Sequence, residues 1–186
     1  MPEISDYLAL GMGLPQVTSW LSGIRVWELD SASGVVTVGC PGRVLLVAQA
    51  PSRGGGAPLS GRAGARLRGL LGCPGEADFQ ASFDAFNLVP VWSGMSGKGD
   101  RFPLPLARAV AARVHFRSDR VVLFGGAAEA FGVRTLFQWH PLGSALVAAA
   151  PHPSGVNRWW NDDQNQKVAA TFFDSISPSH VGRRAC

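Results

Sequence analysis

Residues 44–50 read VLLVAQA, a run of apolar side chains interrupted by Gln49. A continuous apolar run of this length is typical of a strand buried on both faces, as in a parallel sheet. The glycine- and proline-rich stretch PSRGGGAPLSG follows at residues 51–61, and apolar spacing then predicts a helix from Arg62 to Leu71. The segment therefore predicts a strand, a loop and a helix in succession.

The same order of strand and helix recurs along the rest of the chain. Apolar runs predict further strands at residues 83–91, 120–124 and 145–150, and helical spacing predicts helices at 104–116, 127–131 and 162–175. Asn161 or Asp162 is the expected N-cap of the last helix. Alternating strands and helices predict an α/β fold, a three-layer sandwich with a central, four-stranded, mainly parallel sheet. We expect a single domain over residues 1–186, with a lead-in at 1–40 and a flexible tail at 176–186.

Composition narrows the class of protein. The 186 residues carry a net charge of +4, and all but two of the 17 basic residues are Arg. This mild excess is compatible with binding a polyanion, although a high-GC genome would also favour Arg. Three dispersed cysteines without a C-x-x-C spacing predict neither a metal nor an iron–sulfur cofactor, and they fit a reducing cytoplasm. We expect no membrane span, no signal peptide and a monomer.

The loops that leave the carboxyl ends of parallel strands usually build the functional site, and here they are residues 49–61, 90–103 and 151–161. The first loop lacks the G-K-[ST] ending of a triphosphate-binding loop. His152 follows a buried strand directly, so it is a candidate donor to a developing anion. Asn87 lies within a strand, and its amide has the donor and acceptor needed to read a pyrimidine edge. Each feature alone is equally compatible with an ordinary structural role.

Together, and in this order, these segments resemble the motifs of the uracil-DNA glycosylase superfamily. Residues 48–53, AQAPSR, resemble its first motif, and residues 58–64, PLSGRAG, are similar to the stretch that follows in the thermostable classes. Residues 121–128, VVLFGGAA, are similar to a family strand and helix. The H-P-S at residues 152–154 matches the second motif, which leads into an intercalating loop. The resemblance covers about residues 40–175.

The resemblance implies an α/β fold of the uracil-DNA glycosylase type and an enzyme that flips a pyrimidine out of DNA and hydrolyses its N-glycosidic bond. The catalytic candidates are His152, which would stabilise the departing base anion, Gln49, and Asp84 as a water-positioning carboxylate. The base-binding candidates are Asn87, Gln49, Ala50, Ser52 and Phe86. The DNA-binding candidates are Arg53, Arg62, Ser154, Gly155, Val156, Asn157 and Arg158. Strand alternation places Asp84 and Phe86 on the face opposite Asn87 unless the strand bends.

Departures from the family pattern are informative. Ala50 stands where the best-known members have an activating Asp, although the thermostable classes also have Ala there. Ser52 stands where a Tyr shields the pocket from C5 substituents, so larger pyrimidines are not excluded on that ground. Among the three candidate loops, 49–61 and 151–161 contain no Lys, and Lys98 lies in the loop 90–103. The absence of Lys from the two motif loops argues against Schiff-base lyase chemistry and favours a monofunctional enzyme that leaves an abasic site.

Three other functions stay open from the sequence. Ala50 is compatible with a non-catalytic DNA-binding protein of the same fold. A glycosylase specific for hypermodified pyrimidines in phage DNA would also have these motifs. A hydrolase of another class is disfavoured, because residues 94–98, GMSGK, lack the second glycine of a nucleophile elbow.

Overall fold

The central sheet of the computed structural model contains five strands in the order β4-β3-β6-β8-β7. The structure describes residues 27–30, 33, 35–51, 57–59, 61–89, 102–154 and 157–180. Four strands run parallel: β3 (Val44–Ala48), β4 (Phe83–Asn87), β6 (Arg120–Phe124) and β8 (Ala145–Ala150). They correspond to the four apolar runs, so the prediction of an α/β fold with a mainly parallel sheet is confirmed. The fifth strand, β7 (His140–Leu142), is antiparallel to β8 and was not predicted.

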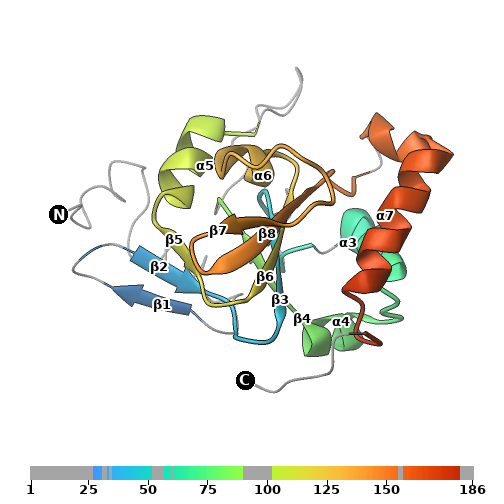
Figure 1. Cartoon of the computed structure of the whole chain (residues 1–186), viewed down its shortest axis with the longest axis horizontal. Helices are drawn as coiled ribbons and strands as arrows, with labels where there is room; N and C mark the ends of the chain where they lie inside the picture. Colours follow the sequence, from blue (N-terminus) through green and yellow to red (C-terminus); the bar gives the residue numbers. More distant parts are fainter. Residues whose placement is uncertain are drawn as a thin grey trace.

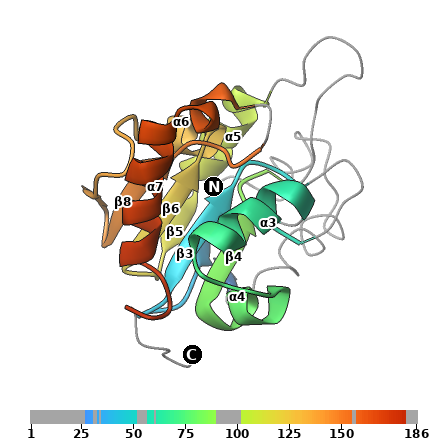
Figure 2. The same ribbon diagram turned by 90° about the vertical axis from the view of Figure 1, so that its right-hand side faces the viewer.

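Helices cover both faces of this sheet (Figure 1). One face packs against α5 (Leu104–Ala111) and α6 (Gly126–Ala130). The other packs against α3 (Gly61–Leu70), α4 (Glu76–Ser82) and α7 (Asp163–Ser175), which stand in front of the strands in Figure 2. Side chains of β3 alternate between the two cores, as the period of a strand requires. The result is a three-layer sandwich.

A second, three-stranded sheet extends the α5 side of the molecule. It consists of β1 (Trp27–Asp30), β2 (Val35–Val38) and β5 (Val114–Phe116), with β2 antiparallel to β1 and parallel to β5. The predicted helix at 104–116 is therefore too long. It ends at Ala111, because Val114 and Phe116 are buried on either side of exposed His115, which is the alternation of a strand.

The C-terminal part follows the expected pattern more closely. The 3₁₀ helix η1 (Arg158–Asn161) leads into α7, and the Asp162 carboxylate caps α7 by accepting a hydrogen bond from the Asn165 amide at 2.9 Å. Among the described helices, none combines the length and apolar character needed to cross a bilayer. Cys40 is disulfide-bonded, a state that the sparse cysteine count did not lead us to expect.

Candidate active site

The four parallel strands bring the predicted segments to one edge of the sheet. Ala48 at the end of β3 pairs with Asn87 at the end of β4, and Phe124 at the end of β6 pairs with Ala150 at the end of β8. Gln49 and His152 follow directly beyond these ends. Loops at the carboxyl ends of parallel strands are the usual site-forming segments of such folds. The edge is therefore where a functional site is expected.

Two glycines after β6 let Gln49 and His152 approach each other. Gly125 has a backbone φ of +54°, a conformation that residues other than Gly rarely adopt. A β-carbon there would lie 3.0 Å from the His152 β-carbon and 3.3 Å from the Gln49 side-chain amide. A β-carbon on Gly126 would lie 2.7 Å from Gln49 Nε2 and would also collide with the Phe102 ring. Gly125 therefore lies against both Gln49 and His152, and Gly126 lies against Gln49; we call this pair the glycine floor.

Asn87 occupies the last position of β4 and is 7% exposed. The ladder continues past it, because the Leu88 amide donates to the Ala48 carbonyl at 2.9 Å and the Val89 amide to the Gln49 carbonyl at 3.0 Å. Asn87 is therefore held beside the Gln49 backbone. Ala50 is half-buried and packs at the margin of the core on the α5 side.

Phe86 does not share the direction of Asn87. It is fully buried in the core cluster on the α5 side of the sheet, as the alternation of a strand requires. The structure therefore places the Phe86 ring in the core and not beside the Asn87 amide.

His152 has a defined hydrogen-bonding state. Its ring nitrogen Nδ1 accepts a hydrogen bond from the Ser154 amide at 3.2 Å. In the neutral imidazole the proton then resides on Nε2, which is left as a donor. Burial lowers the pKa of His152 below its ordinary value of 6.5. At neutral pH the residue is therefore an uncharged hydrogen-bond donor at the edge of the sheet.

The candidates for DNA contact fall into three groups. Arg62 on α3 and Arg158 on η1 are exposed. The Asn157 side chain turns inward instead: its Oδ1 accepts from the Trp159 amide at 3.1 Å, and its Nδ2 donates to the His152 carbonyl at 3.3 Å. Ser154 uses its amide to hold His152. Three DNA-contact candidates, Arg53, Gly155 and Val156, lie outside the described residues, and so does the base-binding candidate Ser52.

Asp84 is not brought to this edge. It lies near the start of β4, three residues before Asn87, or about 10 Å along a strand. Its Oδ1 accepts a hydrogen bond from Arg43 Nε at 3.0 Å, and both side chains are buried. Arg43 also donates to the main-chain carbonyls of Gln80, Ala81 and Phe83. The carboxylate therefore compensates a buried guanidinium that joins α4 to β4, and we do not retain Asp84 as the water-positioning group.

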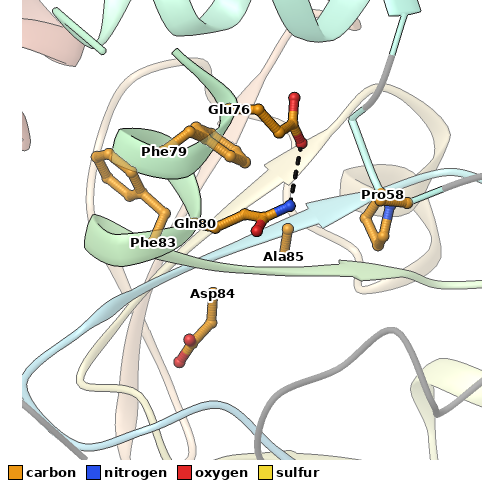
Figure 3. A pocket seen from close by; sticks show the side chains of 8 residues that line it. Pro58, Glu76, Phe79, Gln80, Phe83, Asp84 and Ala85 are labelled. Atoms are coloured by element: carbon orange, nitrogen blue, oxygen red, sulfur yellow. Dashed lines mark hydrogen bonds between the residues drawn. The ribbon is translucent and has the colours of Figure 1, made fainter. Parts of the chain in front are cut away.

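A cavity of about 270 Å³ lies between α4 and the first residues of β4 (Figure 3). Its lining consists of Ala57, Pro58, Glu76, Phe79, Gln80, Phe83, Asp84 and Ala85. In Figure 3 the Glu76 and Gln80 side chains are joined by a hydrogen bond, and Asp84 projects to the opposite side of β4 from Ala85. The cavity includes none of Gln49, Asn87 and His152, so it is separate from the edge described above. Within the described ranges, no three His, Cys, Asp or Glu side chains converge on a metal-sized site.

Sequence reasoning did not identify Trp160, whose indole Nε1 donates to the His152 carbonyl at 2.8 Å. The sequence held one general signal for such a contact. A buried Trp normally finds a partner for its N–H, but the sequence does not show which residue that partner is.

Comparison with known proteins agrees with this arrangement. The family model of the uracil DNA glycosylase superfamily matches residues 38–175, about three quarters of the chain. The matched range spans all four parallel strands together with His152 and α7. A search of curated proteins gives no match. On the family match, the chain belongs to the uracil DNA glycosylase superfamily.

Proposed function

We propose that the protein is a monofunctional DNA glycosylase that excises a pyrimidine and leaves an abasic site. Membership of the superfamily supports an activity on DNA of this class. The observation that carries the proposal is the state of His152, a partly buried neutral imidazole whose Nδ1 is occupied and whose Nε2 is a donor. It shares one sheet edge with Gln49 and Asn87.

The chemistry that such a donor supports is stabilisation of a leaving group. The target base must first be extruded from the stack, at a cost of a few kcal/mol. As the bond between the base nitrogen and C1′ breaks, the base takes the electron pair and becomes an anion, while the sugar becomes oxocarbenium-like. Nε2–H of His152 would donate to the developing charge on O2 of the base. Water then adds to C1′, and the proton that it releases balances the charge of the base anion, so the products are the neutral free base and an abasic sugar with a C1′ hydroxyl. A fixed donor favours the transition state because it needs no reorganisation.

Asn87 is our candidate for reading the base. Its amide has one acceptor and two donor hydrogens, the complement of a pyrimidine edge, and it is held beside Gln49. Ala50 and Ser52 are small. We therefore propose a substrate range that includes uracil and pyrimidines with a C5 substituent, among them modified bases of phage DNA. Arg53, Arg62 and Arg158 are the proposed phosphate contacts.

A panel of oligonucleotides tests this function. Each would contain one uracil, one mismatched thymine or one C5-modified cytosine, in single- and double-stranded form, and alkali would reveal abasic sites. We expect strand cleavage after alkali for at least one of these bases and none before it. Binding without abasic sites across the panel would identify a non-catalytic DNA-binding protein instead. Cleavage before alkali would contradict the monofunctional assignment.

A further inference from the structure

The main-chain carbonyl of His152 accepts hydrogen bonds from two side chains. The indole Nε1 of Trp160 donates at 2.8 Å and Nδ2 of Asn157 donates at 3.3 Å. The same residue's ring accepts from the Ser154 amide. His152 is therefore held at its backbone by η1 and at its ring by the following turn. A buried main-chain carbonyl normally has at least one hydrogen-bond partner, and here two side chains bond to the same oxygen.

Trp160 is itself fixed from two sides. It is 5% exposed and packs in the core between α3 and α7. The Arg66 guanidinium of α3 lies 5.8 Å from the centre of its ring, within the range of a cation–π contact. From α7, Gln166 Nε2 donates to the Trp160 carbonyl at 2.9 Å, and Asn165 Nδ2 donates to the Trp159 carbonyl at 3.1 Å. The indole N–H therefore has a fixed position relative to both helices.

We propose that Trp160 is a positioning residue that holds His152 in register with Gln49 through the bond from its indole N–H to the His152 carbonyl. For its effect on catalysis the proposal rests on the proposed function, because it assigns the ring of His152 to the reaction. The physical reason is the steep dependence of rate on geometry. A displacement of 1 Å in a catalytic group can cost about a hundred-fold. Gln49 and His152 share the glycine floor, so a shift of the His152 main chain changes their spacing directly.

Trp160→Phe removes the N–H and keeps an apolar ring. Trp159→Phe is the matched control. The Trp159 ring packs edge-on against Trp160 and at a tilt against Phe137, but among the described residues its indole makes no hydrogen bond to His152. We expect Trp160→Phe to lower the single-turnover rate of base excision by about ten- to a hundred-fold with little change in DNA affinity. Trp159→Phe should leave both quantities within about two-fold of the wild type.

A second readout does not depend on activity. In protein labelled with ¹⁵N-histidine, the His152 signals are identified by their loss in His152→Asn. In Trp160→Phe we expect the Nδ1 and Nε2 signals of His152 to shift and the pKa of the ring to move towards its ordinary value, because a displaced ring is better hydrated. Trp159→Phe should leave the His152 signals in place. Unchanged His152 signals together with an unchanged rate in Trp160→Phe would overturn the proposal, and so would equal effects of the two variants.

Two further measurements keep the outcome decisive. If Trp160→Phe does not fold, Asn157→Asp removes the second donor and keeps the oxygen that accepts from Trp159, and the His152 signals are compared without DNA. Wild-type signals in that variant would count against control of His152 through its carbonyl.

If the wild-type protein excises no base, the proposed glycosylase function fails. The spectra of Trp160→Phe and Trp159→Phe would still decide whether Trp160 positions His152.

Discussion

The imidazole of His152 is shielded from water and accepts a hydrogen bond at Nδ1. Protonation would place a hydrogen on Nδ1 against the Ser154 N–H and charge a partly buried ring, so both effects oppose it. If the neutral ring is the active form, the single-turnover rate should stay level as pH falls from neutral through 6.5. It should decline only at the lowered pKa of the folded protein. A pH–rate profile under single-turnover conditions measures this.

The lowered pKa of His152 also determines how the stability of the folded protein depends on pH. The unfolded chain takes up a proton at the ordinary pKa of His152, before the folded protein does. Stability linked to this residue is therefore present above the unfolded pKa and decreases as pH falls below it. A single-turnover rate that already declines on the alkaline side of pH 6.5 would contradict the assignment of the neutral, partly buried His152 ring as the donor.

Asp84 tests the distinction between a structural and a catalytic carboxylate. Asp84→Asn removes the charge that compensates the buried Arg43 guanidinium. Breaking a buried ion pair in this way typically costs about 3–5 kcal/mol, so chemical denaturation should show a lower free energy of unfolding. The single-turnover rate of the folded fraction, measured well below the melting temperature, should be unchanged. Normal stability with a strongly reduced rate would return Asp84 to the catalytic machinery.

At the residue scale, the sequence predicted side-chain types more readily than their partners. His152 was identified because it follows a buried strand directly. The inward bonds of Asn157 and the pairing of Asp84 with Arg43 depend on contacts between segments, which local patterns do not encode. Alternation did place Asp84 and Phe86 away from Asn87, because the side-chain period of a strand is local.

Among the elements, α6 controls the floor of the site. In Gly126→Ala the new β-carbon would displace Gln49 and Phe102, although Ala suits the start of a helix. We expect a lower single-turnover rate together with a loss of stability of about 1–3 kcal/mol, because the Phe102 ring must shift to make room. Gly69→Ala is the control, because Gly69 lies in α3 with open space around it, so the exchange should stabilise the protein by up to about 1 kcal/mol and leave the rate unchanged. Wild-type activity in Gly126→Ala would show that the position of Gln49 does not matter.

The element η1 exposes Arg158 next to the segment that holds His152. If Arg158 contacts a phosphate, Arg158→Ala should reduce the dependence of DNA affinity on salt by about one contact. Arg120→Ala is a control of equal charge, because Arg120 is exposed at the start of β6, the opposite end of that strand from the site. Fluorescence anisotropy at several salt concentrations gives both slopes. Equal slopes for Arg158→Ala and the wild type would remove Arg158 from the interface.

Elements were predictable where their pattern is long and uniform. β3, β6 and β8 have almost wholly apolar sequences because they are buried on both faces, whereas β4 also contains Asp84 and Asn87. Short elements were missed. The three-residue strand β5 was merged with α5, and β7 contains a proline that is tolerated because it lies on an edge strand. The seven-residue helix α4 also escaped, because so few residues define no clear period.

At the scale of the whole molecule, the topology assembles the candidate site. Gln49, Asn87 and His152 are far apart in the chain, and parallel pairing of β3, β4, β6 and β8 brings the ends of their strands to one edge. The order of the motifs made the family recognisable from the sequence, and the family model confirms it. The choice of base was not predictable in the same way, because it depends on side chains whose neighbours come from several loops.

The central claim is that His152 promotes release of a free base from DNA. The most direct measurement is mass spectrometry of the base and of the abasic strand after a single turnover, with the wild type and His152→Ala on the best substrate of the panel. We predict equimolar base and abasic strand from the wild type, and a rate lower by about 10²–10³-fold for His152→Ala at nearly equal DNA affinity. A His152→Ala protein that binds DNA poorly but reacts at the wild-type rate once bound would contradict the account.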